Sequence, residues 1–159
     1  MEPNLNRRSA LGLLAAGAAT IPVPAATAPR GADRAPHTAL LDTYVDAWRR
    51  RDLDAIVACM HPELRFEAPT GSLRGIADYR KATAQFLALV RSAGLRAKLI
   101  SGDQAMLAFD FICVPPIGTS RVADLVTFRA GKIAVSELFF DTAPFKAFAE
   151  ARRASAGTR

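Results

Sequence analysis

The chain has 159 residues, half of them apolar, and a net charge of +6. This length fits one globular domain with a real hydrophobic core and leaves little room for two. The charge is spread along the chain without a basic block interleaved with aromatic residues, which argues against a nucleic-acid-binding surface.

The first 28 residues have the layout of an export signal. Asn6-Arg7-Arg8-Ser9 precedes an apolar run over residues 10–19, and small residues follow up to Ala28. This predicts cleavage near Ala28 and a periplasmic or secreted protein, with no stable membrane span because the run is too short. The paired arginines resemble the twin-arginine class, which implies folding before export, although the usual bulky residue is replaced by Ala10. The alternative is a cytoplasmic protein with an alanine-rich N-terminus.

The next segments have helical periodicity. Residues 29–36 are rich in proline, glycine and charge and are predicted to be a linker. Residues 37–51 follow as a helix whose apolar stripe is Leu41, Tyr44, Val45 and Trp48. Asp52 can cap a short second helix that ends at His61-Pro62. The two helices are expected to form a tight hairpin.

The remainder is predicted to be one strand, one helix and then mainly sheet. A strand over residues 64–68 and a turn over 69–72 precede a helix over 76–92. Turn sequences then separate four strands of an antiparallel meander over residues 95–101, 104–114, 120–129 and 132–141. Phe145 and Phe148 suggest a last short helix or tail on the sheet, and residues 151–159 a mobile basic tail. This order predicts an α+β fold with a cavity between helix and sheet.

Asp124 is the anomaly in the predicted sheet. Strand alternation places it on one face with Val122, Val126 and Phe128, which are all apolar. Burial of an unpaired carboxylate costs several kcal/mol or more, so Asp124 must be partnered, protonated or at a cavity. Two interpretations stay open, namely a functional acid and a structural aspartate bonded to a loop amide or an arginine.

Three strings carry a family resemblance. They are YVDAWRRRDLDAIV at residues 44–57, FEAPTGSLRG at 66–75, and the hairpin SRVADLVTFRAGKIAVSELFFD at 120–141. Over residues 37–148 the chain resembles the nuclear transport factor 2-like superfamily, in particular its SnoaL-like and ketosteroid isomerase-like members. The resemblance implies a cone-shaped, curved antiparallel sheet wrapped around a long helix, with an N-terminal helical hairpin and an apolar cavity. It also implies a homodimer through the outer sheet face, and the members range from enzymes to plain binding domains.

The isomerase-like pattern implies three functional positions: a tyrosine on the first helix, a carboxylate base after the first strand, and a protonated aspartic acid on the sheet. Tyr44 matches the first position and Asp124 the third, while the base position is Ala68, which cannot accept a proton. Glu67 could replace the base only if the strand bulges, and His61 only if its loop folds inward. Tyr44 could equally be an ordinary core tyrosine.

Alternation also predicts the wall of the cavity. The expected lining consists of Ala68, Phe109, Phe111, Val126, Phe128, Leu138 and Phe140, although such an aromatic stripe also suits a plain core. Asp110 and Glu137 are expected to face outward or toward a dimer seam.

Other chemistries find little support. Two distant histidines and the lack of a cluster of metal-ligating residues argue against a metal site. The chain also has no glycine-rich phosphate-binding loop and no Gly-x-Ser-x-Gly nucleophile elbow, and no cofactor is expected. Cys59 and Cys113 could pair in an exported domain or remain buried thiols.

The sequence therefore predicts an exported SnoaL-like domain that holds a small, apolar, carbonyl-bearing molecule, with Tyr44 and Asp124 on its oxygen. Two classes stay open: a cofactor-independent isomerase, cyclase or dehydratase, and a non-catalytic ligand-binding or dimerisation domain.

Overall fold

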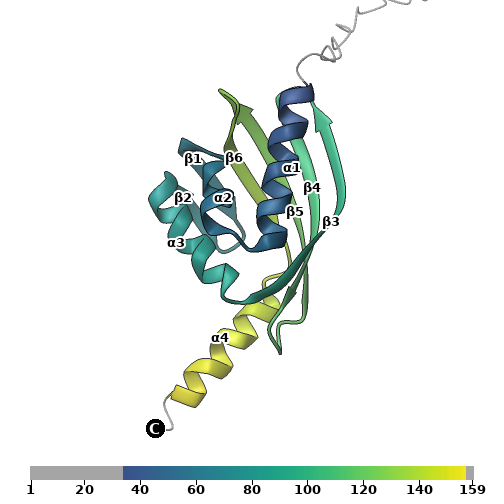
Figure 1. The fold of residues 1–159 in the computed structure, drawn as a ribbon. Helices are drawn as coiled ribbons and strands as arrows, with labels where there is room; N and C mark the ends of the chain where they lie inside the picture. Colours follow the sequence, from purple (N-terminus) through teal and green to yellow (C-terminus); the bar gives the residue numbers. More distant parts are fainter. Residues whose placement is uncertain (1–33, 157–159) are drawn as a thin grey trace, which may run out of the picture.

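The structure is a computed structural model that describes residues 34–156 (Figure 1). The predicted export signal, residues 29–33 of the linker and residues 157–159 of the tail lie outside the described residues. Three helices lie on one face of a six-stranded sheet that curves around them without closing, and a fourth helix projects from one end (Figure 1). The α+β fold expected from the sequence is confirmed.

The four helices are α1 (Arg34–Arg50), α2 (Leu53–Ala58), α3 (Ile76–Leu87) and α4 (Ala143–Ala156). α1 begins three residues earlier than predicted, inside the expected linker. Its proline, Pro36, lies in the first turn, where a missing amide proton breaks no helical hydrogen bond. α4 is longer than the predicted short helix and includes residues 151–156 of the predicted tail, a stretch rich in alanine and arginine, which favour helix.

The sheet has the strand order β2-β1-β6-β5-β4-β3. The last four strands, β3 (Val90–Ser101), β4 (Gln104–Cys113), β5 (Thr119–Arg129) and β6 (Lys132–Phe139), form the predicted antiparallel meander. β1 (Met60–Ala68) extends this sheet by pairing parallel to β6. β2 (Gly71–Arg74) then pairs antiparallel to β1 at the edge.

Boundaries on and beside the sheet also differ from the sequence-based expectation. The third helix ends at Leu87, and Val90 onward belongs to β3, because Val90 pairs with Cys113 and a β-branched residue suits a strand. β2 occupies part of the predicted turn, since its short edge strand has almost no alternation to reveal it. β1 begins at Met60, and its pairing with β6 is interrupted before Arg65, around Pro62, which lacks an amide donor.

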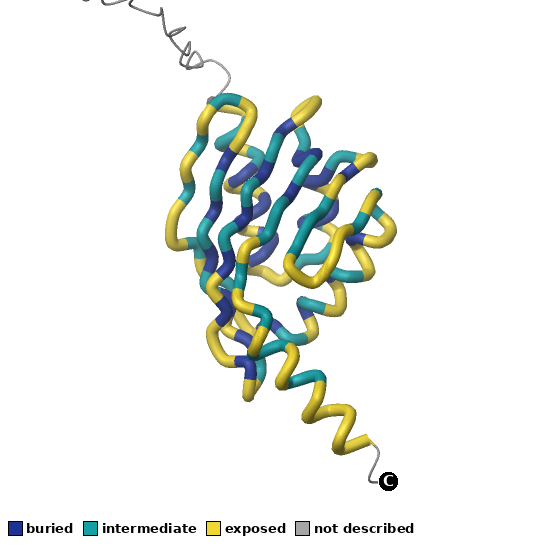
Figure 2. Tube along the Cα trace, turned by 180° about the vertical axis from the view of Figure 1, so that it is seen from behind, coloured by how far each residue is buried: buried dark blue, intermediate teal, exposed yellow. Residues whose placement is uncertain are grey.

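The core lies between α1 and the inner face of the sheet. In β5 the residues Val122, Asp124, Val126 and Phe128 are all buried, so the predicted face is the inner one. Figure 2 shows the same alternation of buried and less buried positions along the neighbouring strands. Cys59 and Cys113 are both buried free thiols, which decides between the two alternatives left open by the sequence.

We expect Asp52→Ala to destabilise the domain by about 1 kcal/mol in urea unfolding, because the Asp52 carboxylate caps α2. Its Oδ1 accepts a hydrogen bond of 3.0 Å from the Ala55 amide. Asp52→Asn is the matched control, since asparagine caps equally well but cannot form the exposed 4.0 Å ion pair with Arg50. Equal losses in both variants would assign the effect to the ion pair.

Candidate functional site

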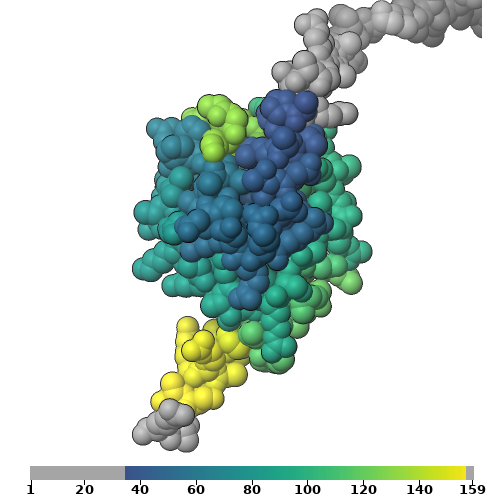
Figure 3. Space-filling view, viewed as in Figure 1, coloured from purple at the N-terminus to yellow at the C-terminus, as the bar shows by residue number. Residues whose placement is uncertain are grey.

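A cavity of about 170 Å³ lies between α1, α3 and the inner face of the sheet. Its walls are mainly aromatic and include Trp48, Phe66, Phe86, Phe109, Phe111 and Phe140. Phe145 at the start of α4 also lines the cavity and contacts Phe86 and Phe140. α4 projects from one end of the body (Figure 3), and among its residues only Phe145, near its start, lines the cavity.

The buried end of the cavity holds a three-residue hydrogen-bond network centred on Asp124. The Tyr44 hydroxyl donates to Oδ2 of Asp124 at 3.2 Å, and the Ser136 hydroxyl donates to Oδ1 at 2.8 Å. All three residues are buried, and Asp124 is only 2% exposed. The sequence-predicted pair is thus in contact, and Asp124 is bonded to side-chain hydroxyls and not to a loop amide or an arginine.

Burial sets the protonation behaviour of this network. Desolvation raises the pKa of Asp124 from 3.8 to about 6, although the hydrogen bonds from Ser136 and Tyr44 lower it. Desolvation also raises the pKa of Tyr44 well above 10, helped by nearby Tyr79 and Asp124, so its hydroxyl keeps its proton. Burial thus shifts the Asp124 carboxyl toward its neutral form, which is the direction that an acid protonated in the cavity requires.

Ser136 is a site residue that the sequence reasoning missed. A register shift in the β5–β6 hairpin between Thr127 and Phe128 places Ser136 opposite Val126 and diagonal to Asp124. A regular two-residue hairpin would have turned Ser136 toward the other face. A serine alternating with the apolar residues of this strand is the signal that could have identified it.

Tyr79 and Thr83 on α3 were also missed. Both are buried and line the cavity. Desolvation and the Asp124 charge raise the pKa of Tyr79, while hydrogen bonding with the Tyr44 and Thr83 hydroxyls lowers it. Two hydroxyl side chains four residues apart on one apolar helix face were the available signal, because such a pair places both oxygens on one side.

The predicted wall is correct in part. Ala68, Phe109, Phe111, Leu138 and Phe140 line the cavity. Val126 and Phe128 do not, although both are buried on the predicted face. α1 packs directly on that part of β5, where the His37 ring stacks on Phe128 with centroids 4.1 Å apart, and this contact fills the space.

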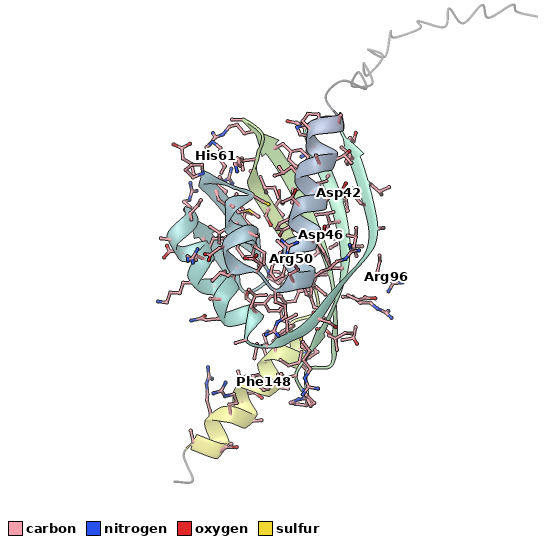
Figure 4. All side chains as sticks on the ribbon, viewed as in Figure 1. Asp42, Asp46, Arg50, His61, Arg96 and Phe148 are labelled. Atoms are coloured by element: carbon pink, nitrogen blue, oxygen red, sulfur yellow. The ribbon has the colours of Figure 1, made fainter. Side chains whose placement is uncertain are left out.

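Neither proposed substitute base reaches the cavity. Glu67 pairs with exposed Arg65 at 3.1 Å. His61 contacts the Glu63 amide and Arg129, at the opposite end of the domain from Phe148 on α4 (Figure 4). In the part of the chain that the structure describes, Asp124 is the only carboxyl group lining the cavity.

Several residues lie away from the site. Asp110 forms ion pairs with Arg96 and Arg121 on the outer face, as expected, and Glu137 is half-buried. Between residues 34 and 156, no cluster of His, Cys, Asp or Glu side chains is suited to a metal ion. Within the same range, no helix is long and apolar enough to cross a bilayer.

Comparisons with known proteins agree with this architecture. The sequence profile of the SnoaL-like domain family matches residues 41–136. No curated protein sequence matches the chain. Among solved structures, a protein from Kribbella flavida DSM 17836 is 23% identical with a TM-score of 0.66, over 72% of this chain and 94% of its own.

Two further solved structures carry provisional activity names. One, named as a ketosteroid isomerase from K. flavida DSM 17836, is 17% identical with a TM-score of 0.60, over 68% of this chain and 79% of its own. The other, named as a polyketide cyclase from Sinorhizobium meliloti, is 19% identical with a TM-score of 0.58, over 64% of this chain and 94% of its own. At these identities the likeness concerns the fold. The profile match spans most of the elements that build the cavity, and the chain belongs to the SnoaL-like domain family.

Proposed function

We propose that this domain binds a small, largely apolar molecule bearing a carbonyl or enol oxygen and catalyses cofactor-independent proton transfer on it, in an isomerase-, cyclase- or dehydratase-type reaction. The observation that carries the proposal is the Asp124 carboxyl, held by Tyr44 and Ser136 at the buried end of an aromatic cavity. Polar groups that converge in an otherwise apolar pocket are the usual pattern of a small-molecule site.

The energetics favour a functional role for Asp124. An ionised carboxyl group in this environment destabilises the fold, as its raised pKa shows. Replacing a buried polar network by apolar residues is often neutral or stabilising, so the fold alone does not require the acid. A carboxyl with a pKa of about 6 can accept and return a proton near neutral pH, which is what a general acid or base must do.

The cavity volume limits the size of the ligand. A dry protein cavity of about 150 Å³ holds benzene, and this cavity has about 170 Å³. We therefore expect the buried part of the ligand to be a single ring with small substituents. Larger ligands would have to extend past Phe145 and the exposed Thr70.

The alternative is a ligand-binding or dimerisation domain without chemistry, and Ala68 at the base position favours it. Exposed Ile112 and Phe139 on the outer face of the sheet are available for the expected homodimer, and sedimentation over a range of concentrations measures it. Binding without turnover of enones would favour this alternative over the enzyme.

We expect Tyr44→Phe and Asp124→Asn each to weaken binding of enones and phenols about fivefold, because each removes one hydrogen bond to the ligand oxygen or to its partner. If the domain is an enzyme, Asp124→Asn should also lower turnover by about 10² to 10⁴. Calorimetry and a turnover assay on a panel of single-ring compounds provide the measurements. Asp110→Asn is the matched control, since Asp110 lies on the outer face; unchanged binding in both site variants would remove them from the site.

We expect wild type to lose stability relative to Asp124→Asn as pH rises from 4 to 7. The pKa of Asp124 is raised in the folded state, so its stabilising contribution is complete below pH 4 and is lost as the pH passes through about 6. The loss relative to the variant is about 3 kcal/mol, because each pH unit between the pKa of Asp124 in the unfolded chain and its pKa in the folded protein contributes about 1.4 kcal/mol. Urea unfolding at a series of pH values measures this difference. A parallel pH dependence in the two proteins would show that Asp124 ionises as freely as in the unfolded chain.

We also propose that the chain is exported and cleaved near Ala28, by the twin-arginine route. Produced with its first 28 residues in a bacterium that has this pathway, the protein should accumulate in the periplasm with a shortened N-terminus. Replacing Arg7 and Arg8 by lysine should retain the uncut form in the cytoplasm. Cell fractionation and N-terminal mass spectrometry measure both outcomes, and an uncut wild-type protein in the cytoplasm would contradict the proposal.

A further inference from the structure

The Ser120 hydroxyl is a buried polar group that faces the cavity without a hydrogen-bond partner. Ser120 is 8% exposed and lies near the start of β5, on the same inner face as Asp124. Its side chain lines the cavity and forms no hydrogen bond with another described residue. The ring nitrogens of His37 and Trp48 also lack partners, but protein atoms enclose them, whereas the Ser120 oxygen is not enclosed. A buried hydroxyl without a partner is destabilising, so Ser120 is a candidate contact for a ligand.

Most other polar side chains of the cavity belong to one cluster around Asp124. Tyr44 and Ser136 each donate a hydrogen bond to the Asp124 carboxyl. Burial raises the pKa of Tyr79, and hydrogen bonding with the Tyr44 and Thr83 hydroxyls lowers it, so these three hydroxyls lie together. We call these five residues the Asp124 cluster. Tyr79 and Thr83 line the cavity and can contact a ligand as Tyr44 and Asp124 can, so the cluster serves one ligand oxygen at the buried end.

Ser120 lies at the other end of the cavity from Asp124. The two residues are four positions apart on one strand, which is about 13 Å, and the β4–β5 pairing has no register shift between them. Ser120 pairs with Phe111, whose ring contacts Phe86. Phe86 in turn contacts Phe145 at the start of α4. Ser120 is therefore a polar group within the aromatic end of the cavity, near α4, and is too distant to bond the ligand atom that Asp124 bonds.

We propose that the ligand carries oxygen groups on opposite sides of one ring, and that Ser120 bonds the oxygen that lies away from the Asp124 cluster. Two hydrogen bonds of about 2.8 Å within the strand distance of about 13 Å leave about 7 Å between the two ligand oxygens. A benzene ring with para oxygen groups, one of them on a short carbon arm, spans this distance. Thr70, another polar residue of the wall, is exposed and is solvated without a ligand. This inference rests on the proposed function and narrows its ligand to a para-oxygenated ring.

Three phenols test the second contact by calorimetry: para-ethylphenol, para-hydroxyphenylethanol and meta-hydroxyphenylethanol. The first lacks the second oxygen, and the last carries it at the wrong place on the ring. Wild type should bind the para alcohol about fivefold more tightly than either of the others, because only this compound bonds Ser120 as well as the Asp124 cluster. In Ser120→Ala this preference should fall to about one, with the affinity for para-ethylphenol unchanged. Ser101→Ala is the matched control, because it makes the same change at an exposed residue outside the cavity and should keep the preference.

Stability and a second variant separate this role from the alternatives. Without ligand, Ser120→Ala should unfold at the same or a higher urea concentration than wild type, because the hydroxyl has no partner in the fold. Asp124→Asn should weaken both para compounds equally and leave their ratio unchanged. Equal affinities of wild type for the two para compounds, a preference that Ser120→Ala retains, or a loss of stability in Ser120→Ala would each overturn the role of Ser120 and leave the proposed function standing. If none of the three phenols binds wild type, the proposed one-ring ligand fails, and this inference fails with it.

Discussion

The site depends on the burial of one carboxyl group, that of Asp124, on the inner face of the sheet. Asp124 is surrounded by apolar side chains, and burying it is tolerated because hydroxyls from α1 and β6 each satisfy one of its oxygens. The network therefore fixes three elements relative to one another. A displacement of α1 along the sheet by one turn, or a change of one residue in the β5–β6 register, would leave the carboxyl unpaired.

The same contacts explain why α1 both completes the fold and forms the site. Its first half packs on β5 without a gap, where His37 stacks on Phe128. Its second half carries Tyr44 and Trp48, whose rings meet Phe109 and Phe111 edge to face. This second half lines the cavity, and α3 closes the other side with Tyr79 and Thr83. The helix thus positions its polar atoms through the aromatic packing of its own apolar stripe.

The sequence predicted the parts of this arrangement that follow from local periodicity. The helical stripe identified Tyr44 as buried, and strand alternation identified Asp124 as an acid on an apolar face. Ser136 was missed although it alternates with Leu138 and Phe140, which were predicted to line the cavity, because alternation alone does not show that a serine on this face bonds to Asp124. The sequence analysis placed Val126 and Phe128 on the cavity wall because strand alternation predicts which face of the sheet a residue is on. Alternation does not predict along which part of that face a helix packs directly on the strand. The edge strand β2 was missed since four exposed or half-buried residues carry no periodic signal.

The alanine at position 68 constrains the chemistry as strongly as the acid does. A carboxyl group there could serve as the base that the isomerase-like pattern implies at this position. Ala68 instead leaves that position apolar, and in the described residues the titratable groups lining the cavity, Tyr44, Tyr79 and Asp124, gather at the buried end. In the proposed enzyme, acid and base functions would then share one network and act on the ligand oxygen or on atoms beside it. Such a site suits enolisation or ring closure steered through an oxygen better than proton movement between distant carbons.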